Sequence, residues 1–213
     1  MKTDDLVSLL ATGAGAVDVR APARRSIAAI VGGALVATIL MALWLDVRPT
    51  LARDATLPLF WVKELFCVAL AATGLFAVAR LSRPGAALGR LEALAGAPIL
   101  AMWLLAAVVL AAAEPQDRTA LIQGVSWAEC PYNIAVLSVP VFAAIVWAMR
   151  GFAPTQLRRA GAAAGFAAGA IGALAYTLHC PELDPPFLAI WYVAGVLTPT
   201  IVGAIAGPRL LRW

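Results

Sequence analysis

The sequence is dominated by apolar blocks of about 20 residues, the length that a helix needs to cross the hydrocarbon core of a bilayer. Short charged or proline-containing stretches separate six such blocks: Ser26–Trp44, Phe60–Ala79, Leu94–Ala113, Ile134–Met149, Gly161–Leu178 and Phe187–Ala206. Backbone polar groups in lipid must bond within the chain, so each block is expected to be a helix. The sequence therefore predicts an all-α integral membrane protein with six transmembrane helices.

Two of the blocks are weaker than the others, and composition supports the general class. The fourth is short and contains Pro140, and the fifth is rich in Gly and Ala, so four, five or seven spans remain open. A hydrophobic share of 62% and a charged share of 13% are far from those of an ordinary soluble domain.

Basic residues divide unequally between the two sides of the six-helix arrangement. With the N-terminus inside, the outer side holds Arg48, Arg53, Lys63 and Arg118, and the inner side holds the rest of the 16 Lys and Arg residues. Cytoplasmic loops carry such an excess. Both termini are therefore expected to be cytoplasmic, in a multi-pass protein of a bacterial inner membrane. The net charge of +4 reflects this orientation, so it predicts no direct nucleic-acid binding.

The chain divides into a cytoplasmic tail, residues 1–25, and a membrane domain, residues 26–213. In the tail, Leu6, Leu9 and Leu10 fall on one face of a two-turn helix. A helix of this length is unstable alone in water. The tail is therefore either disordered or a docking motif that lays these leucines into a partner's groove.

Two cysteines carry the clearest potential for chemistry. Cys130 and Cys180 both fall on the outer side, in the contexts Glu-Cys-Pro and His-Cys-Pro-Glu. A periplasm is oxidising, so a structural disulfide is one interpretation. The others are a labile disulfide that reports oxidants, or a thiolate pair that binds a soft metal ion such as copper, zinc or cadmium with His179.

Lys63 and Cys67 are auxiliary candidates at the outer end of the second block. They lie four residues apart, hence on one helix face. A nearby ammonium favours the thiolate, although such a lysine more often snorkels to the membrane interface. If Cys67 approaches Cys130 and Cys180, the three thiols and His179 would form one outer cluster.

The sequence contains no standard catalytic signature. It has no CxxC, HExxH, P-loop or dinucleotide fingerprint, so no catalytic residue is assigned and no enzyme is expected. Two other classes stay open. A membrane thiol oxidoreductase would require a CxxC, and a small metal permease would require ligands at mid-membrane depth.

Taken together, the motifs resemble a known family. The chain begins Met1-Lys2-Thr3-Asp4-Asp5-Leu6, opens its second block with Phe60-Trp61-x-Lys63, and contains Glu129-Cys130-Pro131 and His179-Cys180-Pro181-Glu182. With six blocks, this resembles the DUF1109 family, typified by NrsF-like inner-membrane anti-sigma factors.

The resemblance implies a mechanism. The tail would hold an extracytoplasmic-function sigma factor at the membrane, with Leu6, Leu9 and Leu10 as its apolar anchors. Cys130 and Cys180 would sense metal or oxidative stress and trigger release. Such coupling requires that the thiol state favour one helix arrangement over another. The resemblance assigns no role to Cys67.

Overall fold

The computed structural model describes residues 3–12, 18, 21–86, 89 and 91–212, and within these ranges the regular structure is helical, with no strand. The six predicted blocks are confirmed as helices. They correspond to α2 (Ala21–Trp44), α4 (Pro58–Leu81), α5 (Leu91–Ala112), α7 (Cys130–Arg150), α8 (Leu157–Tyr176) and the continuous run of α9 (Pro185–Phe187), η1 (Leu188–Tyr192) and α10 (Val193–Leu210). Helix α2 begins at Ala21, inside the segment assigned to the tail.

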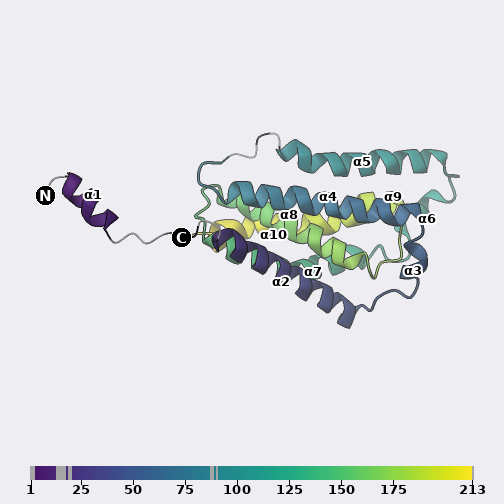
Figure 1. The fold of residues 1–213 in the computed structure, drawn as a ribbon. Helices are drawn as coiled ribbons and strands as arrows, with labels where there is room; N and C mark the ends of the chain where they lie inside the picture. Colours follow the sequence, from purple (N-terminus) through teal and green to yellow (C-terminus); the bar gives the residue numbers. More distant parts are fainter. Residues whose placement is uncertain (1–2, 13–17, 19–20, 87–88, 90, 213) are drawn as a thin grey trace.

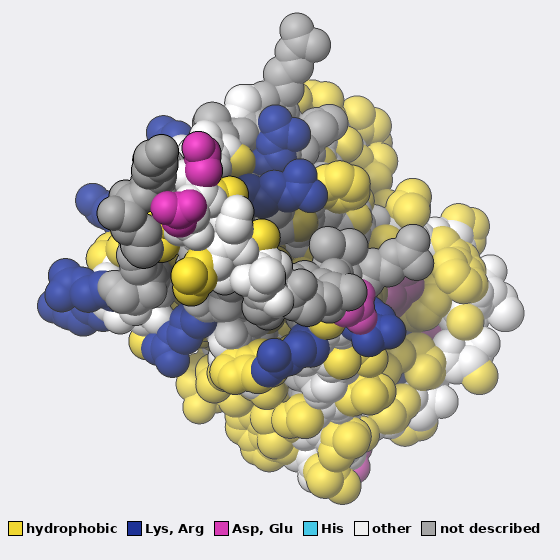
Figure 2. Space-filling model, turned by 60° about the vertical axis from the view of Figure 1, so that its left-hand side comes forward, with side chains coloured by type: hydrophobic (Ala, Val, Ile, Leu, Met, Phe, Trp, Pro, Cys, Tyr) yellow, Lys and Arg dark blue, Asp and Glu magenta, His cyan; other side chains and the backbone are white. Residues whose placement is uncertain are grey.

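The long helices run from one end of the bundle to the other, and α2 begins at the same end at which α10 finishes (Figure 1). The opposite end carries the short helices α3 (Leu51–Asp54) and α6 (Arg118–Gln123), together with α9. Helix α1 (Thr3–Ala11) precedes the bundle. Figure 2, turned toward the end that holds the chain termini, shows Lys and Arg side chains gathered around it.

Helix α8 lies at the centre of the bundle and packs against α10, α4, α7 and α2. A side chain at Gly161 would overlap the carbonyl oxygen of Gly203, and one at Gly165 would overlap that of Pro199. Small residues thus let the α8 and α10 backbones touch. We call this backbone contact between α8 and α10 the glycine seam.

Four helices in the described part of the chain are long and apolar enough to cross a membrane: α2, α4, α7 and the run Pro185–Leu210. The described apolar stretch of α5, Gly96–Ala112, is shorter. Helix α8 is rich in Gly and Ala because it faces other helices on most sides, so its sequence is less apolar than that of a lipid-facing span. Six crossings and cytoplasmic termini therefore remain predictions.

Candidate functional site

The structure brings Cys130 and Cys180 into direct contact at the end that carries the short helices. Cys130 is the first residue of α7, and Cys180 lies in the turn between α8 and α9. The side chains of Cys130 and Cys180 interact with each other directly. Both side chains are fully buried, and both cysteines are free rather than joined in a disulfide. We call these two residues the thiol pair.

The turn that holds Cys180 begins where α8 runs out of helical hydrogen bonds. The N–H groups of His179 and Cys180 both donate to the Tyr176 carbonyl, which closes the last turn of the helix. Pro181 follows and has no N–H with which to continue a helix. The chain therefore leaves α8 at this point and presents the Cys180 side chain to the start of α7.

Lys63, on α4, holds this turn through hydrogen bonds from its side chain. It does not snorkel to the membrane interface. It is fully buried, and its ammonium donates hydrogen bonds of 2.8 Å to the Cys180 carbonyl and 2.9 Å to the Glu182 carbonyl. The Nζ atom lies 5.1 Å from the centre of the Tyr192 ring. These acceptors lie in the protein, so the side chain satisfies its N–H groups without reaching toward water.

Arg48 is a second cation at the same turn, and sequence reasoning missed it as a site residue. Its Nη1 donates to the Cys180 carbonyl, and its Nε lies 3.4 Å from a carboxylate oxygen of Asp54. Its backbone N–H donates to the Leu178 carbonyl. The sequence indicated only that Arg48 lies on the outer side of the membrane, and many arginines at a membrane interface do so without forming a site.

Cys67 lies in the same apolar cluster as the other two cysteines, whereas His179 is not a member of that cluster. Cys67 is fully buried in α4, one turn beyond Lys63. Aromatic residues Tyr176, Phe187 and Tyr192 complete this cluster. All three thiols therefore share one environment that water does not reach.

Cys180 is the more acidic member of the thiol pair. Its pKa is lowered, first by the interaction with the Cys130 side chain, and then by the charge of Lys63 and a hydrogen bond to the backbone of Glu182. Burial opposes these effects, because it disfavours the charged form. The nucleophilic species of a cysteine is the thiolate, so the two thiols are chemically unequal.

The Glu182 carboxylate, in the turn between α8 and α9, contacts the loop between α6 and α7. The Glu182 carboxylate accepts a 2.7 Å hydrogen bond from the Val125 N–H, and burial raises its pKa. Gly124 has φ +52°, and a Cβ atom there would lie 2.6 Å from both carboxylate oxygens. Ser126 Oγ lies 3.8 Å from the Cys180 sulfur. We call the contact of Glu182 with residues 124–126 the Glu182 clasp.

His179 binds a backbone carbonyl and is not part of an assembled metal site among the described residues. Its Nδ1 lies 2.9 Å from the Asp46 carbonyl oxygen, which can only accept, so Nδ1 carries the hydrogen and Nε2 keeps its lone pair when the ring is neutral. Metal-binding histidines are often held in this way. Among the described residues, however, no group of three His, Cys, Asp or Glu side chains is arranged to hold a metal ion.

The predicted partner-binding leucines lie on α1, which precedes the bundle. Leu6 and Leu9 are 43% and 69% exposed, so both are available to a partner. The side chain of Leu10 lies outside the described residues. Asp4 and Asp5 occupy the first turn, where negative charge favours a helix.

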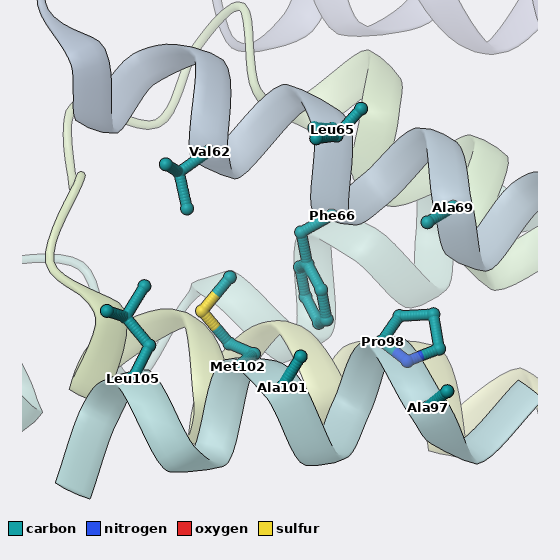
Figure 3. A pocket seen from close by; sticks show the side chains of 9 residues that line it. All are labelled: Val62, Leu65, Phe66, Ala69, Ala97, Pro98, Ala101, Met102 and Leu105. Carbon is teal, nitrogen blue, oxygen red and sulfur yellow. The ribbon is translucent and has the colours of Figure 1, made fainter. Parts of the chain in front are cut away.

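An apolar cavity of about 460 Å³ lies between α4 and α5 (Figure 3). It is lined only by apolar side chains, among them Phe66, Pro98 and Met102. None of the three cysteines borders it, so it adds no chemical group to the thiol site.

Comparison with known proteins places the chain in a family. The model of the family described as "NrsF: Negative regulator of sigma F" matches residues 10–213. The chain belongs to this NrsF family. It is 51% identical to the "Probable anti-sigma-F factor NrsF" of Azospira oryzae and 42% identical to the "Anti-sigma-F factor NrsF" of Caulobacter vibrioides, over the full length of each chain. No solved structure matches. Membership in the NrsF family indicates a regulatory rather than a catalytic protein.

Proposed function

We propose that this protein is a membrane-bound anti-sigma factor that holds an extracytoplasmic-function sigma factor through its tail. In this proposal it releases the sigma factor when the thiol pair reacts with a metal ion or an oxidant. The observation that carries the proposal is the contact between Cys130 and Cys180, in a chain similar over its full length to anti-sigma-F factors.

The proposed placement is the inner membrane, crossed six times with both termini in the cytoplasm. The shared end of α2 and α10 supports an even number of crossings (Figure 1). Exposed arginines at that end support its cytoplasmic position: Arg24, Arg25, Arg80, Arg83, Arg150, Arg158, Arg159, Arg209 and Arg212. The thiol pair then lies on the periplasmic side, where oxidants and metal ions arrive from outside the cell.

The proposed sigma-binding element is α1. Its nine residues are too few for a stable isolated helix, so a partner's groove would supply the missing burial. Leu6, Leu9 and Leu10 would enter that groove.

The proposed signal is a change in the thiol pair. Two adjacent sulfurs can form a disulfide, or can bind a soft ion such as copper, zinc or cadmium together. The free Nε2 of His179 makes it a third ligand in the metal case, provided that the turn around Cys180 rearranges, because the described residues show no assembled metal site.

The test of partner binding is a pull-down of the full chain from host membranes in detergent. The wild type and Ser8→Glu should recover a sigma factor, whereas Leu9→Glu should not. Ser8 lies on the opposite face of α1 and is also exposed, so it controls for the added charge. Recovery with the wild type and with both variants would contradict the role of the leucine face. Recovery with none of the three proteins would contradict the anti-sigma function.

The test of signalling uses the same pull-down after exposure to cadmium or to hydrogen peroxide. The wild type should lose the sigma factor, and Cys130→Ser and Cys180→Ser should retain it. If both serine variants release the sigma factor as readily as the wild type, the thiol pair does not receive the signal. Quinone reduction or metal flux by reconstituted protein would favour a thiol oxidoreductase or a metal permease instead.

A further inference from the structure

A cavity of about 680 Å³ lies at the end of the bundle that holds the chain termini, far from the thiol site. Its walls are the first turns of α2, the last turn of α7 and the residues next to them. Arg25 borders it from α2 and Arg150 from α7, and Trp147 and Phe152 supply aromatic surface. The cavity therefore combines positive charge with apolar side chains, at the end where basic residues gather (Figure 2).

The Arg25 guanidinium keeps its hydrogen-bond donors available. It lies over the Trp147 ring, with its Cζ atom 5.5 Å from the ring centre. A guanidinium that stacks in this way leaves the N–H groups around its edge for other acceptors. Within the described residues, the Arg25 side chain makes no hydrogen bond or ion pair. The ring contact thus positions a cation at the cavity without neutralising it.

Arg150 is held in a similar way from the other wall. Its Nε donates a 2.6 Å hydrogen bond to the Leu210 carbonyl at the end of α10, and in the described part of the chain its two Nη groups have no acceptor. Asp18 also borders the cavity, and its carboxylate lies 3.3 Å from Arg24. The described charges at this place are therefore three arginines and one carboxylate, which favours an anion as the ligand.

Exposed apolar surface continues from the cavity toward the middle of the membrane domain. Ala143 lies one turn from Trp147 on the same face of α7 and is exposed. Gly32 lies two turns from Arg25 on the same face of α2, and a Cβ atom there would meet nothing within 4 Å. Val36, one turn further, is 52% exposed. An anion that carries hydrocarbon chains matches this surface, whereas a soluble anion would use only its charged end.

We propose that this cavity binds the phosphate of an anionic phospholipid from the cytoplasmic leaflet. Arg25 and Arg150 donate to the phosphate oxygens, an acceptor whose geometry suits the guanidinium fork. The acyl chains lie along the exposed faces of α2 and α7. The bound lipid ties the start of α2, the helix that follows the tail, to the end of α7. This site rests on the proposed membrane placement, and neither sigma-factor binding nor the thiol pair enters the argument.

The experiment measures which lipid the full chain retains in detergent. The protein is captured on an affinity resin from mixed micelles that contain equal amounts of phosphatidylglycerol and phosphatidylethanolamine with identical acyl chains, and the bound lipids are quantified by mass spectrometry. Phosphatidylglycerol should be enriched about tenfold in the wild type, because the ammonium of phosphatidylethanolamine offsets the phosphate charge.

Arg25→Gln and Arg150→Gln should each reduce the retained phosphatidylglycerol about tenfold, since each removes hydrogen bonds to a charged group. Arg83→Gln is the matched control. Arg83 is an exposed arginine at the same end, in the connection after α4, and it does not border the cavity. It should therefore change the retained lipid by less than about twofold, because a charge outside the cavity makes no contact with the phosphate.

Inorganic phosphate added in excess distinguishes a lipid site from a site for a soluble anion. It should leave the retained phosphatidylglycerol in place, and displacement of the lipid would overturn the proposal in favour of soluble phosphate. Equal retention of the two lipids would also overturn it, as would equal losses in Arg25→Gln and Arg83→Gln.

Arg25→Gln decides the matter even if Arg150→Gln does not fold, because the Arg25 side chain is exposed and its one contact within the described residues is with the Trp147 ring. Lipid retention is measured without a sigma factor. Failure of the pull-down and failure of the lipid site are therefore separate results.

Discussion

Gly124→Ala should open the Glu182 clasp and expose Cys180 without unfolding the bundle. The new Cβ would lie 2.6 Å from both oxygens of the Glu182 carboxylate, whereas real Cβ contacts essentially never fall below 3.0 Å. The carboxylate is the far end of a flexible side chain, so it will swing away rather than displace a helix. The cost is the 2.7 Å hydrogen bond from Val125 to Glu182.

The size of the effect follows from that hydrogen bond. A bond to a charged group contributes about 1.5–3 kcal/mol, and the lower end applies because this one is reached by solvent. A loss of about 1.4 kcal/mol is a factor of ten in an opening equilibrium. Modification of Cys180 by a maleimide that does not cross membranes should therefore be about tenfold faster, as measured by peptide mass spectrometry over time.

Gly85→Ala is the matched control for this prediction. Gly85 has φ +71°, so alanine strains the backbone there as well, but no atom lies within 4 Å of its Cβ. It sits at the opposite end of the bundle, in the connection after α4. Equal rates for Gly124→Ala and Gly85→Ala would refute the idea that the clasp controls access to Cys180.

Three further predictions test other parts of the structure. Gly74→Ala should destabilise the fold by about 1–3 kcal/mol, because its Cβ would lie 2.8 Å from the Ala167 Cα. The control Gly32→Ala, whose Cβ has no atom within 4 Å, should stabilise α2 by up to about 1 kcal/mol. Unfolding in graded denaturant measures both, and equal effects would contradict the packing of α4 on α8. Glu182→Gln should become more stable relative to the wild type as pH rises above 4.5. The raised pKa of Glu182 means that the wild-type fold favours the protonated carboxyl, so the wild type loses stability as this group ionises. A difference in unfolding free energy between variant and wild type that stays flat with pH, or that falls, would count against this prediction. Cys67→Ser should keep cadmium-induced release of the sigma factor, because the thiol pair is complete without Cys67; loss of release would make Cys67 part of the sensor.

The helices could be predicted from sequence because lipid and helix packing leave few alternatives. Blocks of apolar residues gave all six long helices, and only their ends moved, for example from Ile134 back to Cys130 for α7. The π-helical segment η1 could not be foreseen. Nothing in the letters Leu-Ala-Ile-Trp-Tyr separates it from the α-helix on either side, since the extra residue per turn is set by packing in the bundle.

Most residues of the site could be predicted from the sequence, but the hydrogen bonds between them could not. Matching contexts on one side of the membrane pointed to Cys130 and Cys180, and helical spacing pointed to Lys63 and Cys67. The partners of Lys63 are carbonyls more than 110 residues away, and a carbonyl leaves no mark in a sequence. Arg48 was missed for the same reason. The general preference of lysine for an interface gave the wrong expectation here, because the turn offers acceptors that replace water.

The two members of the thiol pair lie at the ends of different helices of one packed bundle. Cys180 follows α8, which the glycine seam joins to α10 by backbone contact. Cys130 opens α7, which packs along α2, and α2 follows directly from the tail. A new bond between the two sulfurs would therefore tie the turn after α8 to the start of α7, a helix that packs against both α8 and α2. In the proposed function, displacement of α2 would carry the thiol state to the leucines of the tail, because α2 packs along α7 and is the next described helix after α1.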